Sequence, residues 1–295
     1  MNATYIKRGH LAMLLFSLLV AGSFSFGTRV ANLMEPSAMM ALRFVIAGIA
    51  VGVLAAKWTG FKREYLAAPW RYFVLGGLFA IYFCLMFEGL KTASPVSSAA
   101  VFTLTPIMSA IFGYFILRQV TTLWMAYALA IGAAGALWVI FGGDLNALLA
   151  FDIGRGEMVF FVGCIAHALY TPLVRRLNRG EPTMAFTFGM IVAASLILLT
   201  LGGPDLITTD WGILPWYFWA TMFYLAICAS SMTFFLLQYA AMSLPSAKVM
   251  AYTYLTPSWV ILWELVLTGV VPRAAMLLGV AATIVALAML LRNEE

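Results

Sequence analysis

The sequence predicts an all-α membrane protein with ten transmembrane helices, arranged as two inverted repeats of five helices each. The first observation behind this prediction is the composition: 64% of the 295 residues are hydrophobic, 10% are charged, and the mean hydropathy is +0.98. A soluble domain carries about 25% charged residues. Because one core cannot bury so many apolar side chains, lipid is the natural solvent for the remainder.

Ten apolar runs are the second observation, since a helix needs about 20 apolar residues to cross the hydrocarbon. Lys7 and Arg8 precede the first run, as in a signal peptide, but the run is too long and lacks a cleavage site, so we expect a retained helix. The stretch 213–241 holds either one tilted helix or a helix with an interfacial collar of Trp and Tyr. The runs cover residues 11–31, 37–56, 72–90, 95–117, 122–142, 157–174, 183–202, 213–237, 246–268 and 274–291.

The loops differ in charge when they are assigned alternately to two sides. Of the 17 basic residues, 12 fall on the side of both termini and 4 on the opposite side. Cytoplasmic loops carry an excess of Lys and Arg, so we expect both termini in the cytoplasm of a bacterium, with the protein in its inner membrane. This asymmetry accounts for the net charge of +5 without a nucleic-acid partner. A monomer or a weak homodimer is expected.

A repeat of short motifs is the third observation, and it predicts repeats over residues 1–150 and 151–295. Because each half has an odd number of helices, the second half enters the membrane from the opposite side and the repeats are inverted. Two such halves can open a mid-membrane site to each side in turn, which predicts a carrier of small molecules. The matched motifs are Glu35-Pro36 with Glu181-Pro182, Pro95 with Pro245, and Leu104-Thr105-Pro106 with Leu255-Thr256-Pro257, at offsets of 146 to 151 residues.

The two Thr-Pro pairs fall near the middle of the fourth and ninth predicted helices. Proline removes a helical hydrogen bond, and a freed carbonyl at membrane depth is tolerated only where protein or a wet cavity satisfies it. We therefore predict hinges at Pro106 and Pro257, with Thr105 and Thr256 beside them as substrate-binding residues. The alternative is that both prolines are packing kinks.

These features resemble the drug/metabolite transporter superfamily, in its EamA-type branch of ten helices. The resemblance implies that helices 1–4 and 6–9 surround a cavity and that helices 5 and 10 lie outside it. It also implies a secondary transporter, because several members export amino acids and related metabolites, including an aromatic amino-acid exporter. The resemblance is carried by Lys7-Arg8, by the stretch from Glu35-Pro36 to Arg43-Phe44, by Ala93-Ser94-Pro95, by the repeated Leu-Thr-Pro, and by Gly132 and Gly135 in the fifth helix.

One departure from the family pattern concerns the ends of the fourth and ninth helices, where the family often has Leu-Gly-Glu. Here the segments read Phe115-Ile116-Leu117-Arg118 and Leu267-Thr268-Gly269. The nearest acid in the second half is Glu264, so the role of the family's glutamate is not carried over.

Charged residues inside spans are few, which makes each of them informative. Glu88 and Glu264 lie toward the outer ends of the third and ninth helices, and Arg43 lies in the first turns of the second. The two glutamates are candidate sites for a proton or a substrate amine. The alternative is that they pair at the outer interface, Glu88 with Lys91 and Glu264 with Arg43.

His167 is the histidine that lies well inside a span, and it shares a helix face with Tyr170 and Thr171. An imidazole there is a candidate proton relay or hydrogen-bond donor, or a satisfied interhelical contact. Such a pocket of rings, poor in charge, suits an uncharged or zwitterionic solute with an apolar side chain. The predicted lining also includes side chains too deep for an interfacial belt, namely Tyr82, Phe102 and Tyr252, and Gln238, which the repeat sets opposite Glu88.

Other classes of protein fit the sequence less well. A membrane-embedded enzyme needs clustered acids, bases or metal ligands, and the chain has two histidines and no HExxH, so we predict no catalytic residue, metal or cofactor. A channel needs a ring of like groups. Within transporters, multidrug and nucleotide-sugar carriers are the alternatives, although phosphates would need basic cavity groups and Arg43 and Lys248 are the candidates. The three cysteines lie inside apolar runs without metal or disulfide spacing.

Overall fold

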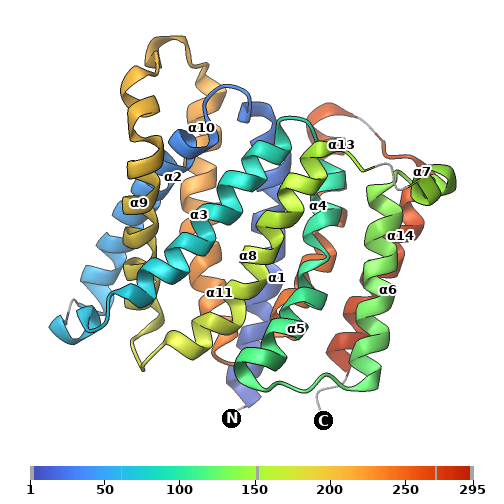
Figure 1. Ribbon diagram of the computed structural model, residues 1–295, viewed down its shortest axis with the longest axis horizontal. Coiled ribbons are helices and arrows are strands. Elements are labelled where there is room, and N and C mark those ends of the chain that lie inside the picture. Colours follow the sequence, from blue (N-terminus) through green and yellow to red (C-terminus); the bar gives the residue numbers. More distant parts are fainter. Residues whose placement is uncertain (1–2, 61, 151–152, 270, 293–295) are drawn as a thin grey trace.

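The computed structural model describes residues 3–60, 62–150, 153–269 and 271–292, and the regular elements in these ranges are helices (Figure 1). Nine helical spans among them are long and apolar enough to cross a membrane, which confirms an all-helical, multi-pass membrane protein. Seven of these spans are single helices, namely α1 (Ala3–Val30), α2 (Pro36–Trp58), α3 (Trp70–Leu90), α6 (Leu123–Ile140), α8 (Arg155–Leu177), α9 (Thr183–Thr208) and α14 (Ala274–Arg292).

The other predicted spans are interrupted helices. Residues 95–117 form α4 (Pro95–Phe102) and α5 (Thr105–Leu117), while residues 216–241 form α10 (Trp216–Ala226), a π-helical segment η3 (Ile227–Met232) and α11 (Thr233–Ala241). The stretch 213–241 therefore holds one span with an irregular middle. Residues 246–268 are divided into α12 (Ser246–Ala251), a 3-10 segment η4 (Tyr252–Leu255) and α13 (Thr256–Thr268). This stretch is not among the nine spans, so the crossing predicted for residues 246–268 stays a prediction.

Two helix boundaries differ from the sequence prediction. Helix α1 begins at Ala3 instead of residue 11, because the polar residues around Lys7 continue the helix beyond the apolar run. Helix α9 continues past residue 202 to Thr208 with Pro204 inside it. Proline is tolerated there because the helix end lies at the bundle surface, where water can bond the freed carbonyl.

The main contacts between two helices each have a counterpart between the corresponding helices of the other half. Helices α2 and α9 pack together, as do α6 and α14, and each pair joins corresponding helices of the two halves. The pairing of α3 with α8 has its counterpart in α11 with α1, and the pairing of α5 with α8 has its counterpart in α13 with α1. This arrangement is what an inverted repeat requires. The predicted boundary between the halves adjoins residues 151–152, which lie outside the described ranges.

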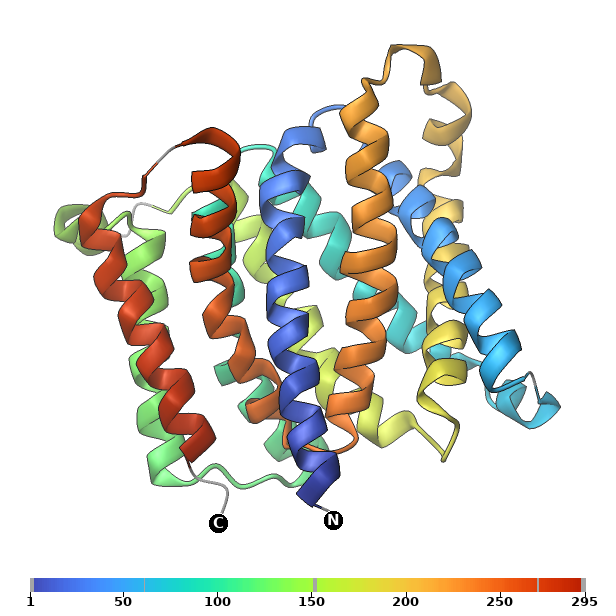
Figure 2. The ribbon, with the colours of Figure 1, turned by 180° about the vertical axis from the view of Figure 1, so that it is seen from behind.

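Helices α6 and α14 lie at one edge of the bundle, and α2 and α9 lie at the other (Figures 1 and 2). The backbones of α6 and α14 touch, since a Cβ added to Gly135 would stand 2.7 Å from the carbonyl oxygen of Gly279. Small residues permit such close packing of helices in a membrane. The fifth and tenth predicted spans are thus held against each other at the edge of the bundle, where α6 also packs on α4 and α14 on η4.

The connections alternate between the two ends of the bundle, and α1 begins at the same end at which α14 ends (Figures 1 and 2). We call this the inner end and the opposite one the outer end. The short helix α7 (Leu145–Ala150) and the 3-10 turn η2 (Trp211–Ile213) lie in outer connections, and the 3-10 turn η1 (Arg63–Leu66) lies in an inner one. The cytoplasmic location of the inner end remains a prediction from the basic residues.

We expect cysteines introduced at Lys62 and at Asp210 to react with an impermeant thiol reagent from opposite sides of the membrane. Both positions are exposed, at the inner and the outer end respectively. Labelling in right-side-out and inverted vesicles measures this, with the wild-type protein as the control for its native cysteines. Reaction of both positions from one side would contradict the arrangement of the ends.

Candidate functional site

A continuous cluster of rings fills the centre of the bundle, and both halves contribute to it. The Phe79 ring centroid is 4.0 Å from that of Tyr170 and 4.4 Å from that of Phe234. No member is more than 2% exposed, so the cluster is closed from both ends in this conformation. This central aromatic cluster consists of Phe24, Phe44, Phe79, Tyr82, Phe83, Phe102, Phe160, His167, Tyr170 and Phe234.

Four of the predicted lining residues are members of this cluster. The ring of Tyr82 lies 4.5 Å from that of His167 and 5.8 Å from that of Phe102, and Tyr170 follows His167 by one turn on α8. Helices α3 and α8 come close because of Gly163, where a Cβ would stand 3.1 Å from the carbonyl oxygen of Tyr82. The structure thus brings together side chains that the sequence placed on three different spans.

Two polar atoms in the central aromatic cluster have no hydrogen-bond partner among the described residues. They are the hydroxyl of Tyr82 and Nδ1 of His167, and both are buried. An unsatisfied buried polar group costs about 1–3 kcal/mol, and each such group calls for an explanation. A phenol and an imidazole that face no protein partner are suited to bind the polar part of a ligand.

Gln238 lies beside the cluster, toward the inner end, and both polar atoms of its amide are hydrogen-bonded to protein hydroxyls. Its Nε2 donates to the Tyr170 hydroxyl at 2.8 Å, and its Oε1 accepts from the Thr187 hydroxyl at 2.6 Å. These bonds join α8, α9 and α11 below the cluster. In this conformation Gln238 therefore closes the inner side of the cluster.

The repeated Leu-Thr-Pro motifs stand where their spans are interrupted. Pro106 lies in the first turn of α5, and Pro257 in the first turn of α13. The missing N–H of proline costs little there, because the first N–H groups of a helix lack intrahelical partners anyway. Each proline thus begins a new helix after a break, whereas the sequence suggested a bend within a continuous one.

The threonines beside these prolines are bonded differently in the two halves. The Thr105 hydroxyl donates to the carbonyl oxygen of Phe102 at 2.7 Å, which is the carbonyl that Pro106 cannot bond. It also lies 3.3 Å from the Thr253 hydroxyl, so the two breaks meet. The Thr256 hydroxyl is buried without a hydrogen-bond partner in the described chain. Of the two threonine hydroxyls at the breaks, only that of Thr105 is therefore hydrogen-bonded in the described chain.

Replacing Pro106 or Pro257 by alanine is expected to lower the transport rate severalfold while expression is kept. The new N–H restores a helical hydrogen bond across the break and stiffens it. Initial transport rates in vesicles, normalised to protein amount, measure the effect, with Pro204→Ala at the surface as the matched control. If both single variants transported at the wild-type rate, the prolines would not be hinges and would serve packing alone.

Tyr252 does not join the central aromatic cluster. Its hydroxyl lies 3.0 Å from Nδ1 of His10, at the inner end of α1. The sequence could not separate Tyr252 from the deeper rings, because the break in its span changes which face each side chain occupies.

The two candidate acids lie at the outer end, away from the cluster, and both form ion pairs. The Lys91 Nζ is 2.8 Å from Glu88, which matches the alternative of an interfacial pair. Glu264 pairs with Arg29 at 3.5 Å, whereas the sequence suggested Arg43.

Among the described residues no group of three or more His, Cys, Asp or Glu is suited to a metal ion.

Arg43 lies in α2, as the sequence predicted, but its partners were not predicted from the sequence. It is fully buried in α2. Its Nε donates to the Ser230 hydroxyl at 2.7 Å and to the Leu225 carbonyl at 3.1 Å, and Nη2 donates to the Ala229 carbonyl at 2.8 Å. Ala229 and Ser230 lie within the π-helical segment η3, and Leu225 lies in the last turn of α10 before it; a π-turn frees carbonyls from regular helical bonding.

The charge of Arg43 touches the central aromatic cluster and is not neutralised. Its guanidinium carbon stands 4.2 Å over the ring of Phe83, which is a cluster member next to Tyr82. In the part of the chain that the structure describes, no carboxylate lies within salt-bridge distance of Arg43. A buried unpaired cation is costly, and an ionisable residue inside a membrane is by default a functional hypothesis. The signal in the sequence was a lone arginine in an otherwise apolar run.

A buried ion pair closes the inner end between the two halves. Arg71, at the start of α3, lies 2.6 Å from Glu181 in the α8–α9 connection, and both side chains are nearly inaccessible. Arg71 also donates to the carbonyls of Leu177, Ala67 and Ala68. It thereby ties the α2–α3 connection to the end of α8.

Comparisons with known proteins agree with this architecture. The EamA-like transporter family matches twice, over residues 7–141 and 154–292. A curated relative from Bacillus subtilis (strain 168), the uncharacterized transporter YyaM, is 30% identical over 197 residues, which are 65% of this chain and 64% of that protein. A protein of known crystal structure superposes with a TM-score of 0.74 over 98% of both chains at 22% identity, which shows the fold alone.

Proposed function

Because the chain belongs to the EamA-like transporter family, we propose that it exports small metabolites, namely amino acids with aromatic or other apolar side chains, across a bacterial inner membrane. The proposal rests on one observation: unpaired polar atoms of Tyr82 and His167 lie among packed rings, next to the unneutralised guanidinium of Arg43. The rings suit an apolar side chain. The guanidinium suits a carboxylate as its counter-charge, and its Nη1, which has only a 3.9 Å contact with the Met40 sulfur in the described chain, is the nitrogen that could donate to it.

The substrate would enter by separation of the rings, since the central aromatic cluster is closed in this conformation. The inverted repeat supports alternating access, in which one half rocks against the other around the site. The inner end would open by breaking the Arg71–Glu181 pair. The broken helices at Pro106 and Pro257 would supply the bending points.

His167 is the candidate for proton coupling within this site. Its imidazole contacts Tyr82 and Phe102, and its Nδ1 is unbonded in the described chain. The acids Glu88 and Glu264 are less suited to this role, because both are paired at the outer end.

A nucleotide-sugar carrier is the weaker alternative. A diphosphate needs several cations to offset its desolvation, whereas Arg43 has most of its donors on protein acceptors, and Lys248 lies in α12 near the inner end. A multidrug carrier of the same superfamily would use the same rings but would not require a carboxylate.

Uptake into proteoliposomes tests the proposal. Purified protein is reconstituted and supplied with labelled phenylalanine, tryptophan, leucine, lysine and a nucleotide sugar, with and without an imposed proton gradient. We expect transport of the three apolar amino acids and none of the nucleotide sugar, with a gradient dependence that His167→Gln removes. Transport of the nucleotide sugar, or of no amino acid, would overturn the proposal.

A further inference from the structure

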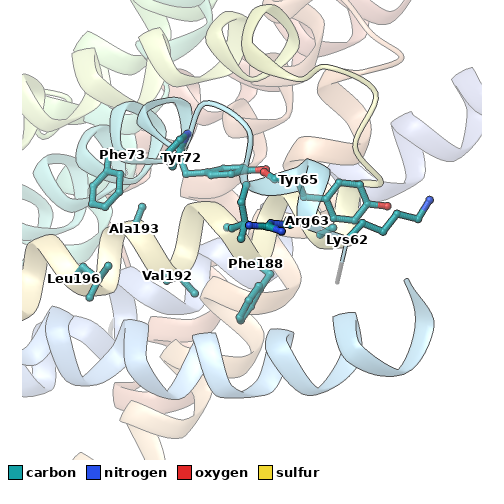
Figure 3. A pocket seen from close by; sticks show the side chains of 13 residues that line it. Lys62, Arg63, Tyr65, Tyr72, Phe73, Phe188, Val192, Ala193 and Leu196 are labelled. Atoms are coloured by element: carbon teal, nitrogen blue, oxygen red, sulfur yellow. The ribbon is translucent and has the colours of Figure 1, made fainter. Parts of the chain in front are cut away.

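A pocket of about 530 Å³ lies at the inner end, where the α2–α3 connection covers one side of α9. Its walls are apolar, with Phe73 on one side and Phe188, Val192 and Leu196 on the other (Figure 3). Figure 3 shows Lys62 at one end of the pocket and Leu196 at the other. The residues that line it do not belong to the central aromatic cluster, so this is a separate site.

The depth of the pocket matches one leaflet of a bilayer. Its lining runs along α9 from Ala185 to Leu196, which is about 16 Å at 1.5 Å per residue. The hydrocarbon core of a bilayer is about 30 Å thick, so half of it is about 15 Å. The pocket therefore extends from the inner membrane surface to about the midplane, as one acyl chain does.

The side of the pocket is open toward lipid. Leu66, Phe73 and Leu196 are 69%, 43% and 50% exposed, and at this depth the surroundings are acyl chains. The Tyr72 ring packs onto α9 at Gly189, where a Cβ would stand 2.8 Å from the ring. A long apolar chain can thus enter sideways, whereas a soluble ligand would meet apolar walls.

The mouth of the pocket is cationic. Lys62 and Arg63 line it. In the described chain Lys62 forms one ion pair, an exposed contact with Glu64 at 3.4 Å, which is a weak interaction. Among the described residues Arg63 has no acidic partner within 4.0 Å. A guanidinium binds a phosphate through two parallel hydrogen bonds.

We propose that this pocket binds an anionic phospholipid of the cytoplasmic leaflet, with its phosphate on Lys62 and Arg63 and one acyl chain along α9. Anionic lipids are concentrated in that leaflet and attract basic residues at its surface. The α2–α3 connection that covers the pocket also supplies the carbonyls of Ala67 and Ala68 to Arg71. The bound lipid therefore holds this connection in place and stabilises the closed inner end.

Native mass spectrometry of the purified protein with added phosphatidylglycerol or phosphatidylcholine tests the proposal. We expect the wild-type protein to bind phosphatidylglycerol about 25-fold more tightly than phosphatidylcholine, since each of the two cations contributes about a factor of five. The double variant Lys62→Gln/Arg63→Gln should lose this preference. Ala193→Trp, which fills the apolar part, should weaken binding of both lipids. Size-exclusion profiles and melting temperatures confirm that each variant is folded.

The matched control removes two cations elsewhere at the inner end. Arg175 and Arg176 are exposed at the end of α8, so Arg175→Gln/Arg176→Gln should keep the preference. Equal loss in both double variants, or equal binding of the two lipids by the wild-type protein, would overturn the proposal. Competition by glycerol 1-phosphate as strong as by the lipid would show a phosphate site instead, which also contradicts it.

Discussion

Replacing Arg43 by methionine is expected to weaken the apparent affinity for apolar amino acids by about 10- to 100-fold, because a hydrogen bond to a charged group contributes about 1.5–3 kcal/mol. Methionine keeps most of the apolar volume of the arginine side chain but removes the one cation that contacts the central aromatic cluster in the described chain. Counterflow of labelled phenylalanine in proteoliposomes, measured over a range of concentrations, gives the affinity.

Two further variants separate the charge of Arg43 from its structural bonds. Arg43→Lys keeps the charge but loses the fork that reaches Ala229 and Ser230, so intermediate affinity is expected. Arg29→Met removes a cation at the outer end that pairs with Glu264, and it should leave the affinity unchanged. Phenylalanine transport by Arg43→Met with the wild-type affinity would show that Arg43 only braces η3.

Replacing Arg71 by methionine is expected to destabilise the protein by about 3–5 kcal/mol, because it removes the counter-charge of the buried Glu181 carboxylate and leaves it with backbone hydrogen bonds such as that from the Arg179 N–H. The two side chains are 1% and 6% exposed, so the pair itself lies largely out of water. Thermal unfolding in detergent, followed by circular dichroism, measures the loss.

The double variant Arg71→Met/Glu181→Met provides the control for this prediction. Since it removes both charges together, it should recover a large part of the stability lost in the single variant. A double variant no more stable than Arg71→Met, or a single variant that melts like the wild type, would contradict the account of the inner end.

The pH dependence of stability reports the same ion pair. Burial raises the pKa of the Glu181 carboxyl, but hydrogen bonds from Arg71 and from the Arg179 backbone outweigh burial, and the pKa lies below its ordinary value of 4.5. Because folding lowers this pKa, the pair stabilises the protein above the ordinary value, and the stabilisation is lost as the pH falls through the lowered one. The melting temperature should therefore fall more steeply below about pH 4.5 in the wild type than in Glu181→Gln.

The sequence predicted nine spans that the structure bears out, the repeated motifs and four of the ten members of the central aromatic cluster, because these follow from local patterns. Apolar runs set the helices, and the depth of Tyr82, Phe102 and His167 within their runs marked them as unsuited to an interfacial belt. Their actual proximity depends on close helix contacts such as that at Gly163, which a single sequence does not reveal. The interruptions at Thr105 and Thr256 were detectable because proline marks them.

The environments of the charged residues could not be predicted in the same way. The bonds of Arg43 depend on the π-helical segment η3, and no proline or glycine in Ile227–Met232 indicates it. Glu264 pairs with Arg29 across helices far apart in the chain, which spacing along one helix cannot show. Arg71 comes just before the predicted third span (72–90), where an exposed side chain is the usual case, yet it is buried and pairs with Glu181.

Competition for bound phenylalanine tests the central claim most directly, namely that the cluster recognises a carboxylate together with an apolar side chain. Labelled phenylalanine is bound to the purified wild-type protein at equilibrium and displaced by 3-phenylpropionate, which keeps the carboxylate, or by phenethylamine, which lacks it. The account predicts that 3-phenylpropionate competes and that phenethylamine competes at least about tenfold less well, as the loss of one charged hydrogen bond implies. Equal competition by the two compounds would contradict it.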